Sequence, residues 1–259
     1  MDLNGKRVLI TGGSSGIGAA AARQMARQGA HTLLIARRAD ALDQVAADIA
    51  AAGGTAQTFA ADLGDPQAVG DVTERIRAEA GVPDVIVNAA GAGRWTGLTK
   101  TGVEELQQML TVPALAAMLV TRAFAEDMIA RGRGQIVNVS SPAGFLAWPN
   151  ACGYIASRRA LQGFNDALRA ELHGTGVQVT AVVLGTVDSP YWRHNPDSAK
   201  SLPRRLPGVM PVLSTEDAAA RIVAAVTKTR RQVVSPPVFR LLFLLNALFP
   251  RITEAAMRA

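Results

Sequence analysis

The chain of 259 residues contains a single cysteine, Cys152, and only three histidines, His31, His173 and His194. One cysteine excludes a disulfide within the chain and a cysteine-rich metal site. The histidines are scattered without metal-ligand spacing, so the sequence predicts no metal centre. A chain without disulfides is typical of the reducing cytosol, and we expect a cytoplasmic protein.

Clusters of basic residues are missing as well, although the net charge is +6. Lysine and arginine are spread over predicted helix surfaces, whereas a nucleic-acid platform needs clustered basic residues interleaved with aromatics, which make up only 5% of the chain. We therefore expect no nucleic-acid partner. The N-terminal segment MDLNGKRVLITGG lacks a basic stretch followed by a long apolar run, which favours a first strand over a signal peptide.

No linker, repeat or composition break divides the sequence, so residues 1–259 are expected to form one domain. Short apolar runs alternate with helical patterns, which predicts parallel strands with crossover helices on both faces of the sheet. The expected fold is α/β, a single Rossmann-type doubly wound parallel sheet. Strands are expected at 7–10, 32–35, 56–60, 85–87, 135–139, 177–183 and 232–234. Helices are expected at 17–28, 41–51, 66–80, 103–131, 155–173 and 215–229.

A glycine-rich turn follows the first predicted strand and precedes an alanine-rich helix. Gly12 permits a tight turn, Gly16 lets the backbone approach a pyrophosphate, and Gly18 lets the helix pack close to the sheet. The helix N-terminus offers free N–H groups to the phosphates. This context predicts a dinucleotide site. Its expected residues in the turn are Thr11, Gly12, Ser14, Ser15, Gly16, Ile17 and Gly18.

The end of the second predicted strand, Ile35-Ala36-Arg37-Arg38, has no carboxylate. An acidic residue there would bind the ribose 2′-hydroxyl of NAD, whereas an arginine suits the 2′-phosphate of NADP. Arg37 and Arg38 therefore favour NADP(H), unless both are solvated surface charges. Asp62 and Leu63 follow the third strand and are expected at the adenine, with a helix-capping role for Asp62 as the alternative.

Tyr154 precedes a permanent cation, Arg158, by four positions. Residues with this spacing share one face of a helix, and a fixed positive charge beside a phenol favours its phenolate form. A tyrosine activated in this way can exchange a proton with a substrate hydroxyl or carbonyl.

Together these motifs resemble the short-chain dehydrogenase/reductase family over nearly the whole chain. The matching segments are 11–18, Asp62, 88–91, Ser140-Ser141 and Tyr154. The resemblance implies that Tyr154 is the general acid/base and that Ser141, thirteen residues earlier, orients the substrate oxygen. The residues that it implies beside the cofactor are Asn88, Ala89, Gly91, Gly185 and Val187.

Two positions depart from the family pattern. Arg158 replaces a lysine that binds the nicotinamide ribose and feeds a proton relay, and Thr111 replaces an asparagine that holds the relay water. Arginine keeps the charge but does not readily pass a proton. We expect an NADP(H)-dependent oxidoreductase that interconverts a carbonyl and a secondary alcohol. The alternative is a weakly active or non-catalytic NADP-binding relative that acts as a sensor or scaffold.

The segment 186–212 is the expected substrate loop, because this region sets specificity in the family. Apolar side chains here and elsewhere predict a mainly apolar substrate, such as a lipid, steroid or retinoid-like molecule, unless they serve ordinary packing. The candidates for the pocket wall are Trp95, Phe145, Leu146, Trp148, Cys152, Tyr191, Trp192 and Met210.

An apolar C-terminal extension covers residues 236–259. Arg240 and Asn246 interrupt its apolar run, which is shorter than the about 20 residues that cross a bilayer. Contact with another subunit is favoured, because family members commonly form homodimers or homotetramers. Two alternatives are a roof over the substrate pocket and a peripheral membrane contact supported by Arg240, Arg251 and Arg258.

Overall fold

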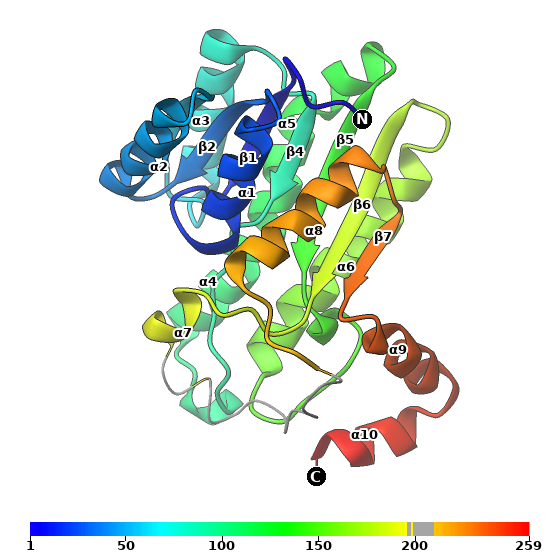
Figure 1. Ribbon diagram of the computed structural model, residues 1–259. Coiled ribbons are helices and arrows are strands. Elements are labelled where there is room, and N and C mark those ends of the chain that lie inside the picture. The colour runs from blue at the N-terminus through cyan, green and yellow to red at the C-terminus, as the bar shows by residue number, and fades with distance from the viewer. Residues whose placement is uncertain (196–197, 199–209, 259) are drawn as a thin grey trace.

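Seven parallel strands form one sheet in the order β3-β2-β1-β4-β5-β6-β7 (Figure 1). The computed structural model describes residues 1–195, 198 and 210–258. All seven predicted strands are present, each longer than predicted by one or two residues. Strand order reverses between β1 and β4, so a crevice opens at the carboxyl ends of these strands. The strands are β1 Arg7–Thr11, β2 His31–Ala36, β3 Thr55–Ala60, β4 Val85–Asn88, β5 Gly134–Ser140, β6 Val177–Leu184 and β7 Gln232–Ser235.

Helices cover both faces of the sheet, as the alternating pattern predicted. The longer helices are α1 Gly16–Ala26, α2 Ala39–Ala51, α3 Pro66–Ala80, α4 Val103–Leu110, α5 Ala116–Ala130, α6 Cys152–Glu171, α8 Thr215–Thr227, α9 Val238–Leu248 and α10 Pro250–Arg258. Shorter helical segments are η1 Leu98–Lys100, η2 Thr111–Leu115, η3 Pro142–Gly144 and α7 Tyr191–His194.

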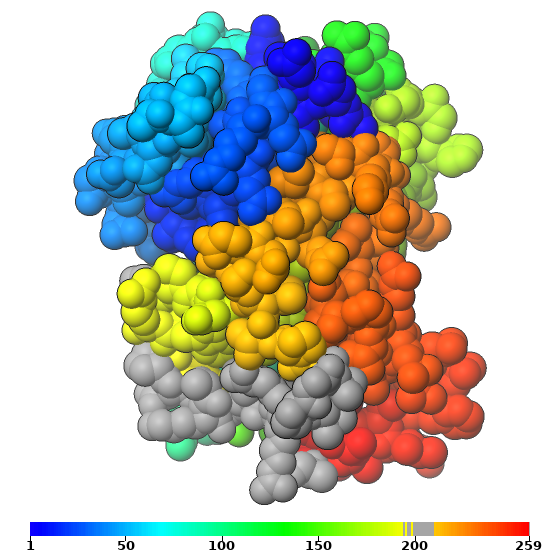
Figure 2. All heavy atoms as spheres, in the orientation of Figure 1, coloured from blue at the N-terminus to red at the C-terminus, as the bar shows by residue number. Residues whose placement is uncertain are grey.

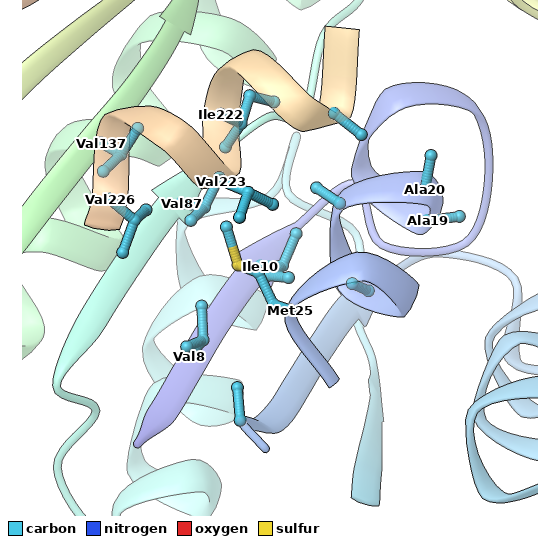
Figure 3. Packing of buried hydrophobic residues seen from close by; sticks show 14 of the residues in the cluster. Val8, Ile10, Ala19, Ala20, Met25, Val87, Val137, Ile222, Val223 and Val226 are labelled. Carbon is cyan, nitrogen blue, oxygen red and sulfur yellow. The ribbon is translucent and has the colours of Figure 1, made fainter. Parts of the chain in front are cut away.

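The hydrophobic core lies in two layers, one on each side of the sheet. In one layer, side chains of β1 such as Ile10 pack against Met25 of α1 and Ile222 of α8 (Figure 3). In the other layer, α3, α5 and α6 cover the opposite face, where Phe59 and Phe124 are fully buried. Strands that are covered on both faces are held rigidly, so their carboxyl ends form a fixed edge for the loops that follow.

The expected helix 103–131 is interrupted, which corrects the sequence prediction. A π-helical turn, η2, separates α4 from α5, and the N–H of Ala116 bonds to the carbonyl of Thr111. Pro113 explains the widened turn, because proline has no N–H to donate and its ring clashes with the preceding turn. The combined span Val103–Ala130 contains an 18-residue window with mean hydropathy 1.4, which is apolar and long enough to cross a membrane. In this fold, however, Val120 and Phe124 of α5 are core residues.

The last two helices, α9 and α10, pack together beyond β7 and against the loop after β5 (Figure 1). Phe243 of α9 stacks on Phe145 with ring centroids 4.2 Å apart. The Asn246 side chain donates to the Phe145 carbonyl at 3.2 Å and accepts from the Thr253 hydroxyl at 2.6 Å. These contacts fix the helix pair above the carboxyl ends of the strands.

Candidate active site

A cavity of about 1320 Å³ lies at the carboxyl ends of the strands. Its walls come from the β1–α1 turn, the ends of β2 and β3, the loops after β4, β5 and β6, and the helices α9 and α10. Ligand pockets typically enclose ~300–1,000 Å³. The cavity is therefore large enough for a dinucleotide together with a second molecule.

The β1–α1 turn forms one end of the cavity, and glycine is required at two of its positions. Gly12 has φ +72, and a methyl group there would lie 3.0 Å from the Cα of Ala90. A methyl group at Gly18 would lie 2.3 Å from the Gly12 carbonyl oxygen, so the close packing predicted for Gly18 is present. The turn residues on the cavity wall are Gly12, Ser14, Ser15, Gly16, Ile17 and Gly18.

Thr11 and Asn88, which were expected beside the cofactor, do not line the cavity. The buried Thr11 hydroxyl accepts hydrogen bonds from the N–H groups of Ala89 and Ala90, both at 3.1 Å. The Asn88 side chain donates to Asn138 at 2.8 Å. Both residues instead position the loop after β4, whose Ala89 and Gly91 do line the cavity.

Arg37 and Arg38 lie exposed at the end of β2, on the cavity wall. No carboxylate in the described part of the chain pairs with either guanidinium, so both are accessible to a phosphate. Asp62 and Leu63 also line the cavity. The capping alternative for Asp62 is wrong, because Asp65 caps α3 by accepting from Gln67 N–H at 2.9 Å.

Ser141, Tyr154 and Arg158 all line the cavity. The Arg158 guanidinium lies over the face of the Tyr154 ring, with Cζ 4.7 Å from the ring centroid, and not beyond its hydroxyl. This is a cation–π contact, which requires a separation below about 6 Å. Ser141 is held at the start of η3, where its hydroxyl accepts from Ala143 N–H at 3.3 Å.

The buried Arg158 guanidinium lies beside the loop after β4 and has an unused hydrogen-bond donor. Its Nε has no hydrogen-bond partner among the described residues. Gly91 faces this guanidinium closely, since a methyl group added at Gly91 would lie 3.2 Å from the Nη2 of Arg158. A buried donor without a partner is costly. The ribose hydroxyls of a dinucleotide are groups that would satisfy it, so the residues present fit such a cofactor.

Thr111 is not brought into the cavity, although it was expected to hold a relay water. Its hydroxyl donates to the Gln107 carbonyl at 2.8 Å within the helix. Gln108, three residues before Thr111, and Val112, the residue after it, line the cavity instead. The π-helical turn decides which side chains of this segment face inward. Pro113 was the sign of that turn in the sequence, and the expectation of an unbroken helix overlooked it.

Three buried asparagines link the cofactor loop to the helix that carries Tyr154. Asn88 donates to Asn138, and Asn138 donates to Asn165 of α6, each at 2.8 Å. All three side chains are at most 4% exposed. Buried amides of this kind fix the relative position of the elements that they join.

Aromatic residues are scarce in the sequence, yet all three tryptophans and both tyrosines line this cavity. The Trp95 ring lies 5.8 Å from Trp148 and 5.6 Å from Tyr154, measured between centroids. Tyr191 and Trp192 form an edge-to-face pair at 4.9 Å. Met210 also lines the cavity. Three further candidates for the wall were wrong: Leu146 is core, Phe145 stacks on α9, and Cys152 is exposed.

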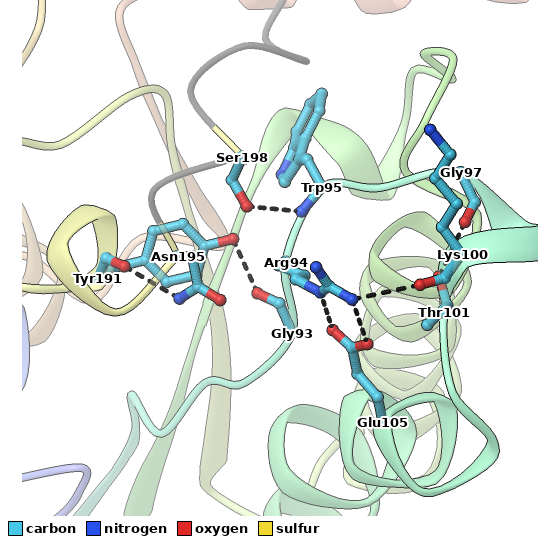
Figure 4. Close-up of polar contacts among 10 residues, drawn as sticks. All are labelled: Gly93, Arg94, Trp95, Gly97, Lys100, Thr101, Glu105, Tyr191, Asn195 and Ser198. Atoms are coloured by element: carbon cyan, nitrogen blue, oxygen red, sulfur yellow. Dashed lines mark hydrogen bonds and ion pairs between the residues drawn. The ribbon is translucent and has the colours of Figure 1, made fainter.

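The segments after β4 and β6 are bonded across the cavity (Figure 4). The Tyr191 hydroxyl donates to the Gly93 carbonyl at 2.7 Å, and the Trp95 N–H donates to the Ser198 hydroxyl at 2.8 Å. Burial, with a smaller contribution from Tyr154, raises the pKa of Tyr191, so this phenol stays a neutral donor. Gly185 and Val187 line the cavity as expected. Of the predicted substrate loop, 196–197 and 199–209 lie outside the described residues.

The C-terminal segment was expected over the pocket only as an alternative, and none of its residues was named as part of the wall. Phe239 and Leu242 of α9 and Met257 of α10 line the cavity. Phe239 and Leu242 are three residues apart and therefore share one helix face. This apolar spacing was visible in the sequence and indicated a face that packs inward. One face of this segment therefore forms part of the cavity wall, as the roof alternative expected, and contact with another subunit or with a membrane stays a prediction.

Comparison with known proteins agrees with this arrangement. Residues 6–200 match the family model of short chain dehydrogenases. The probable oxidoreductase EphD of Mycobacterium tuberculosis is 38% identical over 183 residues, or 70% of this chain, and this chain spans 31% of that protein's length. A fatty acyl-CoA reductase of Acinetobacter baylyi is 30% identical, with 99% of this chain and 84% of that protein covered.

A solved structure shows the same fold. The short-chain dehydrogenase from Sphingobium yanoikuyae in complex with NADPH is 26% identical, with a TM-score of 0.82 and 96% of each chain covered. The family match runs through the glycine-rich turn, the strand before Ser141 and the helix of Tyr154. The chain therefore belongs to the short-chain dehydrogenase family.

Proposed function

We propose that this oxidoreductase uses NADP(H) to interconvert a carbonyl and a secondary alcohol on a mainly apolar substrate. The observation that carries the proposal is that Ser141, Tyr154 and Arg158 line the same cavity as the glycine-rich turn and Arg37. The NADPH in the related Sphingobium enzyme supports the choice of cofactor.

Each part of the cavity would hold one part of the dinucleotide. The free N–H groups at the start of α1 would bind the pyrophosphate, and Arg37 would bind the 2′-phosphate. Arg158, with its unpartnered Nε, would donate to the nicotinamide ribose. When bound, NADPH supplies a hydride to the carbonyl carbon.

Proton transfer is the task of the chain's own residues. Ser141 donates a hydrogen bond that orients the carbonyl oxygen, and Tyr154 gives its phenolic proton to that oxygen. The Arg158 cation over the ring stabilises the phenolate that remains. Arginine does not pass on a proton, so Tyr154, which is only half-buried, regains its proton from water in the open cavity.

The substrate is proposed from the cavity wall beside Tyr154. Trp95, Trp148, Met210, Leu242 and Met257 offer apolar surface there. The related Acinetobacter enzyme is named for a fatty acyl-CoA, a molecule with a long apolar chain, which supports a lipid-like substrate.

The test measures NADPH consumption with aldehydes and ketones of increasing chain length. Turnover should appear and KM should fall as the chain lengthens. Tyr154→Phe should reduce kcat by ~10²–10⁴-fold, the usual contribution of a general acid, while NADPH affinity stays unchanged. NADPH binding by the unmodified protein without turnover of any carbonyl would instead support the sensor or scaffold alternative.

A further inference from the structure

The α9–α10 pair has two apolar faces, and only one of them is used by the cavity. Phe239 is 7% exposed, and with Leu242 and Met257 it faces inward. On the outside lies a set of residues that we call the tail ridge. Its members are Leu241, Leu244, Leu248, Phe249 and Ile252, which are 56%, 55%, 61%, 52% and 68% exposed.

Exposed apolar side chains are concentrated in the tail ridge. Among the described residues, five of the twelve large exposed hydrophobic side chains fall within this one stretch. Isolated exposed leucines need no explanation, but contiguous apolar patches mark interaction sites. Figure 2 shows the two C-terminal helices at a projecting corner of the molecule, where a flat partner has access.

Positive charge borders the tail ridge. Arg240 and Arg251 are exposed at its two ends, and no carboxylate in the described part of the chain pairs with them. Glu254 is the only acidic residue of 236–258, and it pairs with Arg258. The whole chain carries a net charge of +6.

The charges around the tail ridge favour a lipid surface over a second copy of the chain as its partner. A two-fold contact places the same patch against itself, so the arginines at the ends of one ridge would approach those of the other without a carboxylate between them. An anionic lipid surface matches both features, because its acyl boundary accepts the apolar ridge and its headgroups attract the arginines. The 11 residues of α9 are too few to span a bilayer but enough to lie in its surface.

We propose that the tail ridge docks on an anionic lipid surface, with α9 and α10 lying in the headgroup region. Leu241, Leu244 and Leu248 enter the acyl boundary, and Arg240 and Arg251 bind headgroup phosphates. The cavity roof formed by the inner face of the same helices then lies next to the membrane. The proposal goes beyond the oxidoreductase activity and does not depend on it.

The test is sedimentation of the full chain with vesicles of phosphatidylcholine with or without phosphatidylserine. The protein should bind the anionic vesicles, bind neutral ones weakly, and be released at high salt, which screens charges. Replacing Leu241, Leu244 and Leu248 by Gln should weaken binding by at least ~100-fold, because three apolar side chains lose their buried surface. Arg240→Gln with Arg251→Gln should weaken binding and reduce its salt dependence.

A matched control replaces three exposed apolar residues elsewhere, Leu98, Val103 and Leu110, by Gln, and this variant should bind like the unmodified protein. No binding to anionic vesicles, or equal loss in the control variant, would overturn the proposal. So would a dimer in sedimentation equilibrium that the triple ridge variant converts to monomer, because a second copy would then occupy the ridge. The homodimer or homotetramer expected from the family stays a prediction.

Discussion

The two halves of the cavity are built in different ways. The nucleotide half, formed by the β1–α1 turn and the ends of β2 and β3, consists largely of backbone and of residues close in sequence. The substrate half, formed by the loops after β4, β5 and β6 and by α9 and α10, consists of side chains from distant segments. Hydrogen bonds hold these segments together: Tyr191 bonds to Gly93, 98 residues away, and, behind the cavity wall, Asn246 bonds to Phe145, 101 residues away.

This difference explains what each half can tolerate. The nucleotide half depends on the absence of side chains at Gly12 and Gly18, where a methyl group meets backbone that cannot move aside. The substrate half depends on the shape of large side chains such as Trp95, which can be exchanged without disturbing the sheet. Changes in the first half should abolish binding of the cofactor, and changes in the second should alter substrate preference.

The largest expected effect comes from Gly18→Ala. Its methyl group would lie 2.3 Å from the Gly12 carbonyl oxygen, so the turn must shift. We expect a loss of ~1–3 kcal/mol of unfolding free energy, as for other overpacked sites, together with loss of NADPH binding. Thermal unfolding and cofactor titration measure both. Gly70→Ala, where a methyl group meets nothing within 4 Å, should instead raise stability by ~0.5–1 kcal/mol.

Arg37→Ala tests how the nucleotide half of the cavity selects NADPH over NADH. A hydrogen bond to a charged group contributes ~1.5–3 kcal/mol, so NADPH affinity should fall by ~10–100-fold, with NADH affinity unchanged. Isothermal titration measures both affinities. Arg122→Ala removes an exposed arginine away from the cavity and serves as the control. Equal NADPH affinity before and after the Arg37 change would refute its assignment to the 2′-phosphate.

Trp95→Leu should affect the substrate half alone. The ring contacts to Trp148 and Tyr154 are lost, and such contacts contribute ~0.5–1.5 kcal/mol beyond their buried area. KM for a long-chain carbonyl should therefore rise by ~2–10-fold, with NADPH affinity retained. Phe124→Leu, a buried aromatic of α5, should lower stability without changing KM. A Trp95 variant that loses NADPH binding would show that the halves are not separable.

The smallest expected effect concerns His31, which begins β2 at the amino ends of the strands, away from both halves of the cavity. Burial, and then the charge of Arg7, lowers the pKa of His31. The unfolded chain therefore binds a proton at His31 more readily than the folded chain does. The stability that this group contributes is present above about pH 6.5 and is lost as the pH falls below it. Below this pH, the melting temperature of the unmodified protein should fall further than that of His31→Val. The additional fall should be smaller than the ~2–4 °C that a change of 1 kcal/mol in unfolding free energy produces in a chain of this size. Identical pH profiles would contradict this.

The sequence was sufficient where local chemistry decides the structure. Alternating apolar runs predicted every strand, and the glycine spacing predicted the turn that Gly18 makes possible. It was insufficient where packing decides. The π-turn at Pro113 rotates Thr111 away from the cavity, and Arg158 lies on the ring face of Tyr154, which spacing alone does not distinguish from a position beside the hydroxyl.

The most direct test of the account follows a deuterium from NADPH labelled at nicotinamide C4 into the product alcohol by mass spectrometry. The unmodified protein should place one deuterium on the former carbonyl carbon. Tyr154→Phe should bind NADPH equally well and transfer almost none. NADPH binding without transfer by the unmodified protein, or full transfer by the Tyr154 variant, would contradict a reductase in which this tyrosine supplies the proton.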